Sequence, residues 1–227
     1  MSGIRIPSYI AKRMLLTIGS GTALKMLLAL VSMRQPDFLS VPCTLGQLAD
    51  VCGVTPLTAD HNLDALARAF YTEFGHDEPV FTECSMLLTG GSKRKVEIVF
   101  TQNFVDILRC IDGHITIPES EFYEYRMRSA LMMRLRLTPM LGNKTRMACH
   151  FINDNMHWLI GYKSPNMSHA CQVGILPGVE EINTVCHAFT VDVKDRRRGS
   201  AANARIGRLD FDVRKLVSHF ERRRCVA

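Results

Sequence analysis

Two short runs of helically spaced leucines, separated by a glycine and a Thr-Pro pair, stand out in residues 44–70 (TLGQLADVCGVTPLTADHNLDALARAF). The apolar positions are Leu45, Leu48 and Ala49 in the first run and Leu63 and Leu66 in the second. Each run places its apolar residues on one helical face. Gly53 suits a turn with positive φ, while Thr55 and Pro56 suit the N-cap and the first position of a second helix. The pattern therefore predicts a helix-turn-helix.

The segments around this motif are predicted to complete a winged helix. Apolar periodicity favours helices over 8–18 and 22–33, the second of them apolar nearly all round and hence buried. After the motif, residues 79–104 read as two strands joined by a Gly-Gly loop. Helices followed by a β-hairpin are the layout of a winged helix, with residues 90–95 (GGSKRK) at the tip of the wing.

The second half of the chain repeats this order of elements. The periodicity stops around residues 110–114 (CIDGH), so we expect two domains, 1–112 and 113–227. The elements expected in the second domain are one helix from Ser120 that ends at Pro139, an amphipathic stretch over 143–162, a short helix within 175–189, two strands within 189–213 and a closing helix over 213–224. The predicted fold class is α+β, with two tandem winged-helix domains that are mostly helical and carry β-hairpin wings.

Charge is distributed unevenly between the two predicted domains. The whole chain has a net charge of +6 at pH 7. Residues 1–112 hold 10 Lys and Arg against 11 Asp and Glu, a net of −1, whereas residues 113–227 hold 18 against 11, a net of +7. A polyanionic partner should therefore bind mainly to the second half.

The strongest electrostatic feature is the loop of the second hairpin. Its basic residues are Lys194, Arg196, Arg197, Arg198, Arg205 and Arg208, with Asp195 as the acidic residue among them. A hairpin with a small-residue tip can reach phosphates or enter a minor groove, where arginine is favoured. The alternative is a solvated loop whose charges serve solubility. The first wing repeats the idea on a smaller scale with Lys93, Arg94 and Lys95.

The second helix of the motif, residues 56–70, is the candidate recognition helix of the first domain. If it lies in a major groove, Thr58, His61 and Asn62 are the side chains expected near base edges, because recognition helices present their N-terminal residues there. The alternative is a winged helix used for packing or dimerisation. Residues 44–70 favour that alternative by charge, since three Asp and one Arg give a net of −2, and phosphate contacts supply much of the affinity for DNA.

Other function classes find little support in the sequence. The eight cysteines include no CxxC pair, so buried thiols are the expected reading, and a zinc site built with nearby histidines lacks the usual spacing. No GxxxxGK[ST], HExxH or GxSxG motif occurs. No stretch of about 18 uncharged apolar residues occurs, and no signal peptide is recognised. We therefore expect a cytoplasmic protein that is not an enzyme, needs no cofactor or metal and has no membrane partner.

In these features the chain resembles the plasmid replication initiators that bind repeated origin sequences, which carry two winged-helix domains in tandem. The resemblance rests on the helix-turn-helix at 44–70, the wing at 90–95 and the basic hairpin at 194–208, and it covers most of the chain as architecture. It implies origin recognition on double-stranded DNA through both domains, a homodimer that does not initiate, and host replication proteins as further partners. The acidic first recognition helix departs from this pattern, so the C-terminal domain is expected to carry most of the affinity.

Two functions from other classes remain open on the sequence alone. One is a transcriptional regulator, in which a dimer binds a palindromic operator. Inverted half-sites would identify a regulator, and direct repeats an initiator. The other is an interaction module whose winged helices bind proteins, which would show no salt-dependent affinity for DNA.

Overall fold

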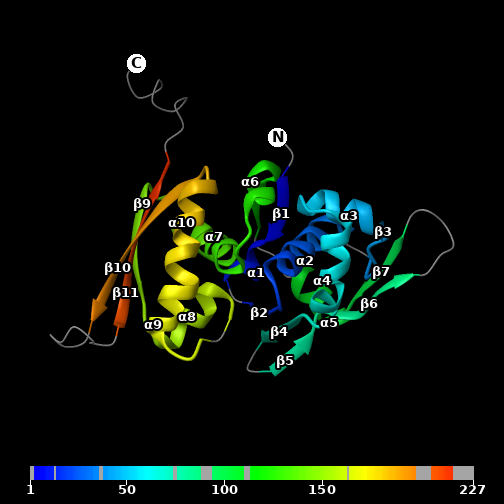
Figure 1. Cartoon of the computed structure of the whole chain (residues 1–227), viewed down its shortest axis with the longest axis horizontal. Helices are drawn as coiled ribbons and strands as arrows, with labels where there is room; N and C mark the ends of the chain where they lie inside the picture. The colour runs from blue at the N-terminus through cyan, green and yellow to red at the C-terminus, as the bar shows by residue number, and fades with distance from the viewer. Residues whose placement is uncertain are drawn as a thin grey trace, which may run out of the picture. The chain divides into compact units, whose positions relative to one another are not determined.

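The computed structural model describes residues 3–12, 14–35, 38–73, 76–87, 94–109, 113–162, 164–197 and 206–216 (Figure 1). The chain divides into two compact units, Met1–Arg128 and Ser129–Ala227. No helix of the described residues is long and apolar enough to cross a membrane. Each unit has its own apolar core and its own three-stranded wing sheet.

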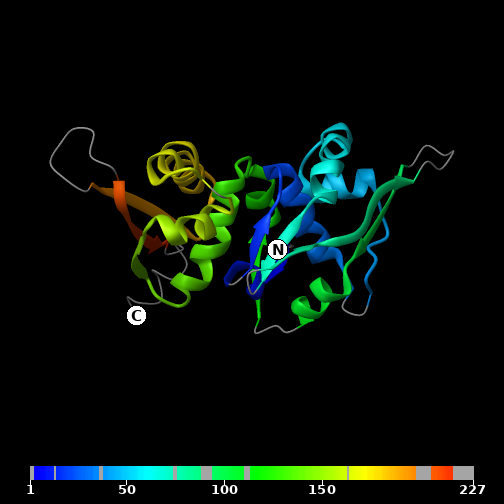
Figure 2. The same cartoon turned by 90° about the horizontal axis from the view of Figure 1, so that it is seen from below.

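Unit 1 is built around the helix-turn-helix that the sequence predicts. Its winged-helix elements are α2 (Gly21–Met33), β3 (Cys43–Thr44), α3 (Leu45–Cys52), α4 (Pro56–Ala67), β6 (Phe81–Leu87) and β7 (Lys95–Phe100). The antiparallel wing sheet has the order β3-β7-β6. Figure 2 shows the β6-β7 hairpin extending away from the helices. Lys93 and the rest of the loop at 88–93 lie outside the described residues.

The turn between α3 and α4 has the predicted geometry. Gly53 adopts φ 64° in the left-handed region, and a Cβ on it would lie 2.7 Å from the Tyr123 ring, so glycine is required here on two grounds. Thr55 accepts a hydrogen bond from the Thr58 N–H as the N-cap of α4, and Pro56 occupies the first turn. Local sequence thus explains the caps of this turn, while the Tyr123 ring adds a distant reason for glycine at position 53.

A buried lysine secures the end of α3. Lys25, on α2, donates through Nζ to the carbonyl oxygens of Cys52 at 3.4 Å and Tyr123 at 2.8 Å. A cation at a helix C-terminus interacts favourably with the helix dipole, and these carbonyls meet its hydrogen-bonding needs in the core. The helix-turn-helix is thereby attached to the central helix of the unit.

The N-terminal segment and the expected domain boundary differ from the prediction. In place of one helix over 8–18 there are α1 (Ser8–Lys12) and β2 (Leu15–Thr17). The elements that the sequence did not reveal are β1 (Gly3–Pro7), β4 (Phe70–Glu73), β5 (His76–Pro79) and α5 (Gln102–Arg109), whereas β8 (His114–Pro118) lies where the sequence indicates an extended piece ending in a proline. Strand β8 pairs antiparallel with β1, so the first unit ends at Arg128 rather than at residue 112. Pairing between strands so far apart in sequence leaves no local signal.

Unit 2 has the same element order and the same sheet connectivity. Its elements are α7 (Arg128–Leu141), β9 (Arg146–Phe151), α8 (Asn153–Ile160), α9 (Met167–His169), the π-helical segment η1 (Ala170–Ile175), α10 (Leu176–Val185), β10 (Phe189–Arg197) and β11 (Ile206–Lys215). The sheet order β10-β11-β9 places the third strand between the first and second, as in unit 1. The predicted fold class, two tandem α+β winged helices, is confirmed.

Two local predictions in the second half are wrong, and a third is wrong in its first residues. The helix expected from Ser120 is two helices, α6 (Glu119–Glu124) and α7, separated by an extended Tyr125, and Pro139 lies inside α7 instead of ending the helix. The stretch over 143–162 is strand β9 followed by α8. The closing helix does not begin at Val213, because β11 continues to Lys215, and residues 217–227 lie outside the described residues. In β9 and at the end of β11, pairing between distant strands overrides a local helical pattern.

Candidate nucleic-acid interface

The three residues of α4 that are expected to contact bases differ in how many hydrogen bonds their side chains already make within the protein. Thr58 is half-buried, and its hydroxyl lies 2.8 Å from that of Thr55, so it belongs to the N-terminal cap of the helix. Asn62 accepts from the Ser20 hydroxyl at 2.6 Å and donates through Nδ2 to the Thr58 carbonyl at 2.8 Å. His61 is exposed. The structure thus joins Thr58 and Asn62 in one network, in which Asn62 ties α4 to the N-cap of α2.

The base of the first wing is linked to α4 by an ion pair. Arg94 Nη1 lies 3.0 Å from Asp60 Oδ2, and the Asp60 side chain is 22% exposed. Lys95 begins β7 and is exposed, opposite Leu87 in the register. A hollow of about 610 Å³ opens between the starts of α3 and α4 and Arg94. The acidity of α4 is therefore partly neutralised by the wing, which the sequence count could not show.

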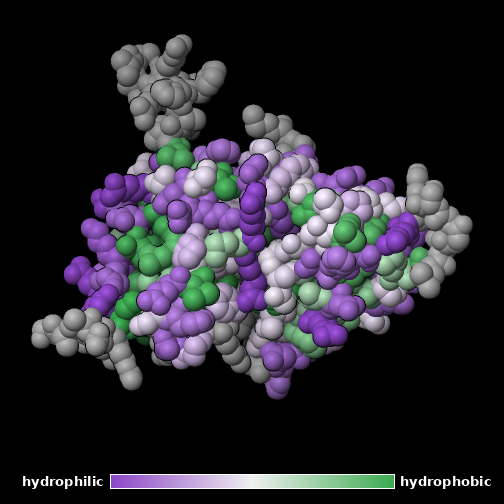
Figure 3. Space-filling model, in the orientation of Figure 1, coloured by the Kyte–Doolittle hydropathy of each residue, from purple (hydrophilic) through white to green (hydrophobic). Residues whose placement is uncertain are grey.

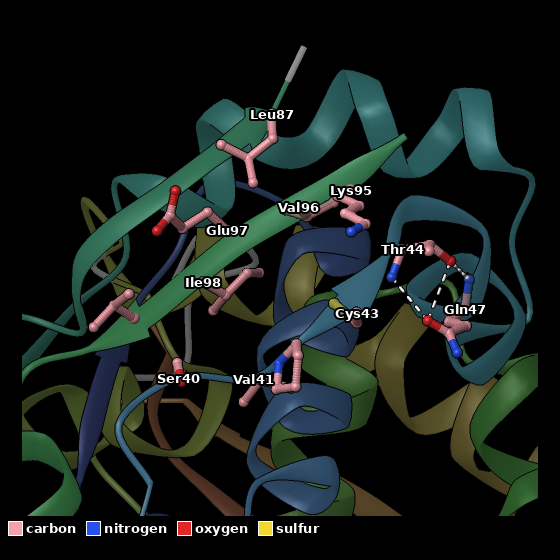
Figure 4. Close-up of a pocket in the computed structure, with 12 residues that line it drawn as sticks. Ser40, Val41, Cys43, Thr44, Gln47, Leu87, Lys95, Val96, Glu97 and Ile98 are labelled. Carbon is pink, nitrogen blue, oxygen red and sulfur yellow. Dashed lines mark hydrogen bonds between the residues drawn. The ribbon is translucent and has the colours of Figure 1, made fainter. Parts of the chain in front are cut away.

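A second hollow lies on the wing sheet itself (Figure 4), with a volume of about 410 Å³. Its walls are largely apolar and include Val41, Val96 and Ile98. Cys43 lines it too, but burial raises the pKa of the Cys43 thiol, so the thiolate is disfavoured. The nearby Thr44 and Gln47 are joined by the capping box of α3, drawn as dashed lines in Figure 4. The hollow offers an apolar surface rather than a set of reactive groups.

The basic hairpin of unit 2 carries its arginines in contact with carboxylates. Arg196 Nε lies 2.9 Å from Asp210 Oδ2, and Arg208 Nε lies 2.7 Å from Asp210 Oδ1. These hydrogen bonds, the one from Arg196 first, hold the pKa of Asp210 below its ordinary value. Arg197 pairs with Asp195 at 3.1 Å. The positive charge of the hairpin is therefore offset by two carboxylates, Asp195 and Asp210, whereas residues 194–208 alone contain only Asp195.

The remaining hairpin residues divide between the strands and the loop. Lys194 is exposed on β10 and stands opposite Asp210 in the register. Arg198 and Arg205 lie outside the described residues. The hairpin thus brings Lys194, Arg196 and Arg208 to one region of the sheet, around a shared carboxylate.

The sequence reading missed a second helix-turn-helix in unit 2. Helix α8 ends at Gly161, which has φ 76°, and Asn166 caps the next helix by accepting from the His169 N–H at 2.9 Å. A C-capping glycine followed by a polar N-cap is the same sequence signal as Gly53 and Thr55 in unit 1, but the turn between the two residues is longer here. The exposed residues at the start of the second helix include Gln172 and Val173.

A π-helical segment interrupts the second helix of this motif, between α9 and α10. It spans Ala170–Ile175, and the Leu176 N–H donates to the Cys171 carbonyl, five residues back. Pro177 follows directly and has no N–H to donate. The wider turn accommodates that proline without ending the helix, and such bulges recur at functional sites.

Among the described residues, no group of three or more His, Cys, Asp or Glu is placed to hold a metal ion. Four described cysteines are buried, namely Cys43, Cys52, Cys171 and Cys186. Burial raises the pKa of the Cys52 thiol to about 12, against a lowering effect of the Lys25 charge. Burial also raises the pKa of the Cys43 and Cys171 thiols, so these three thiols stay protonated at neutral pH and are poor nucleophiles and poor metal ligands.

Two solved structures share this fold over nearly the whole chain. The Pi initiator protein, solved in complex with iteron DNA, is 12% identical with a TM-score of 0.60, and the match covers 92% of this chain and 99% of that one. Domains 2 and 3 of RctB are 8% identical with a TM-score of 0.55, over 93% of this chain and 99% of that one. No protein-family model and no curated protein matches the sequence. The resemblance to tandem winged-helix initiators is confirmed at the level of the fold.

Proposed function

We propose that this protein binds double-stranded DNA in a sequence-specific manner and initiates replication at a plasmid-type origin. The observation that carries the proposal is that the likeness to the Pi initiator, a structure with iteron DNA, extends over both winged-helix units. The basic character of the present chain, with a sequence pI of about 9.0, agrees with a polyanionic partner. On this proposal the protein has no catalytic role at the origin and acts by binding.

The two units divide the binding between them in the proposal. In unit 2, the helix formed by α9, η1 and α10 is the proposed recognition helix, and the hairpin supplies most of the affinity. The basic residues of the hairpin are Lys194, Arg196, Arg197, Arg198, Arg205 and Arg208. In unit 1, His61 is the base-contacting candidate on α4 that is exposed, while Thr58 and Asn62 support the helix from within. Lys93, Arg94 and Lys95 contact phosphates from the first wing. A homodimer and host replication proteins are the further partners that we propose.

The test is selection of bound duplexes from a random-sequence DNA pool at two salt concentrations. An initiator is expected to enrich a defined site as direct repeats, with retention that falls steeply as salt rises. Enrichment of inverted half-sites would instead identify a transcriptional regulator. Absence of any salt-sensitive retention would refute DNA binding and favour an interaction module.

A further inference from the structure

The outward face of the unit 2 sheet carries two similar clusters of charged side chains. In the first, Asp212 on β11 lies between Arg146 of β9 and Arg214 of β11. Arg146 is bidentate, with Nε 2.7 Å from Oδ1 and Nη2 2.7 Å from Oδ2, and Arg214 Nη2 lies 2.6 Å from Oδ2. In the second, Asp210 holds Arg196 and Arg208 as described above. The two carboxylates stand two residues apart on β11, and each holds one arginine of β11 and one arginine of a neighbouring strand.

Exposure shows that the carboxylates lie beneath and the arginines lie on top. The Asp212 side chain is 18% exposed against 63% for Arg146 and 59% for Arg214. Asp210 is 26% exposed, whereas its two arginines are 67% and 47% exposed. In Figure 3 hydrophilic residues border the side of unit 2 formed by β10 and β11. Each carboxylate therefore positions a pair of guanidinium groups that remain open to solvent.

The guanidinium groups keep donors for a ligand after these bonds are made. A guanidinium has five N–H donors, and the bonds of Arg146 and Arg214 to Asp212 use Nε and Nη2. The Nη1 donors of both side chains are not used in these bonds, and planar forks of this kind match the oxygens of a phosphate. Two arginines and one aspartate leave each cluster with a net charge of +1, which fits one phosphate diester.

Stability alone gives a weak reason for this arrangement. Exposed ion pairs contribute about 0–1 kcal/mol, so four arginines held on two carboxylates add little to the fold. The arrangement fits a ligand better, because the arginines offer two separate points of contact. Arg196 stands opposite Arg208 and Arg146 opposite Arg214, six residues apart along β11. Other charged groups on the face are Lys194, which adds to the positive field, and Asp192, which opposes it.

We infer that this sheet face binds two phosphates of the DNA backbone, one at each cluster, with Asp210 and Asp212 as positioning residues for the arginines. The inference rests on the proposed function and adds Arg146, Arg214 and the two carboxylates to the binding surface. The ligand is the phosphodiester backbone, so these contacts carry no base preference and set the register of the bound unit.

The test compares full-length variants in binding to the selected duplex over a range of salt concentrations. R146A/R214A is expected to flatten the dependence of log K on log salt by about 0.9, the value for one phosphate contact. The control R5A/K12A removes two exposed positive charges from unit 1 and is expected to leave the slope near that of the native protein. An R146A/R214A slope equal to that of the control would overturn the inference.

The carboxylate is tested by D212N, for which two views predict opposite signs. If charge alone mattered, losing a negative charge would strengthen binding to every duplex. A positioning role instead predicts about fivefold weaker binding to both the selected and an unrelated duplex, the equivalent of one net hydrogen bond, because these contacts carry no base preference, and D212E should restore part of the loss. Stronger binding of D212N to both duplexes would refute the positioning role.

Failure of the inference and failure of the proposed function are distinguishable in the same experiment. If the native protein shows no salt-dependent retention of any duplex, DNA binding itself is refuted. If the native protein binds and the cluster variants behave as the control does, only the role of the sheet face is refuted. Circular dichroism of each variant shows whether it is folded, and R146K/R214K, which keeps the charge, is expected to keep the slope while losing affinity.

Discussion

Replacing Gly53 by alanine should destabilise unit 1 by two separate physical effects. An alanine in the left-handed region costs about 1–2 kcal/mol. Its Cβ would also lie 2.8 Å from Tyr123 Cβ and 2.7 Å from Cγ. The ring can rotate away, but Tyr123 Cβ is fixed to the backbone, so the backbone must shift, at an overpacking cost of about 1–3 kcal/mol. The expected loss in the free energy of unfolding is about 2–5 kcal/mol.

Gly142→Ala separates the two effects. Gly142 has φ 53°, close to that of Gly53, but the nearest atom that an alanine Cβ would meet there, the Pro139 carbonyl oxygen, is 3.7 Å away. This variant should lose only the backbone part, about 1–2 kcal/mol. Urea unfolding followed by far-ultraviolet circular dichroism reports both units, and fluorescence of Trp158, the single tryptophan, reports unit 2. If the two variants lost the same free energy within about 0.5 kcal/mol, roughly the scatter of such comparisons, the steric argument at Gly53 would be wrong.

Three further predictions concern charge. Replacing the three arginines at 196–198 by alanine should weaken DNA binding and reduce its salt dependence, measured by titration of a labelled duplex at several salt concentrations. The Arg94–Asp60 pair is exposed on one side, so a double-mutant cycle in urea should give a coupling of about 1 kcal/mol or less. Hydrogen bonds from Arg146 and then Arg214 hold the pKa of Asp212 below its ordinary value, so its stabilising contribution is present above about pH 4 and is lost as pH falls further. D212N should therefore reduce the acid-induced loss of stability in unfolding measurements between about pH 5 and pH 2.

The parts of the fold that the sequence predicted are those specified by nearby residues. The caps at Thr55 and Gly53 act within one turn of chain, and the two hairpin wings follow from alternating apolar positions next to small polar loops. The parts that failed depend on distant partners. Strand β9 reads as helical because Met147 and Phe151 are four apart, yet they pair with Val213 and Leu209 across the sheet. Strand β1 finds its partner more than 100 residues away, with Gly3 opposite Pro118.

The candidate site shows the same division between local and distant information. The sequence marked Arg196 and Arg208 by their concentration in one loop, and the structure brings them together. Asp210 lies two residues beyond Arg208 and holds the side chains of Arg196 and Arg208 in place. The loop is therefore not only a concentration of positive charge but also a pair of positioned hydrogen-bond donors. Arg146 gave no signal at all, being a single arginine whose partner, Asp212, is 66 residues further along the chain.

Asn62 illustrates why residue type and helix position do not suffice to identify a base-reading side chain. An asparagine near the start of a recognition helix has the donor and acceptor pair that adenine requires. Here the acceptor is used by Ser20, which also caps α2 through the Ala23 N–H, and the donor by Thr58. Moving the amide into a groove would leave the Ser20 hydroxyl to find another partner, so contact with a base must repay the loss of two hydrogen bonds, each worth about 1 kcal/mol net. In the proposed complex this cost shifts base reading in unit 1 toward His61, whose side chain is already exposed.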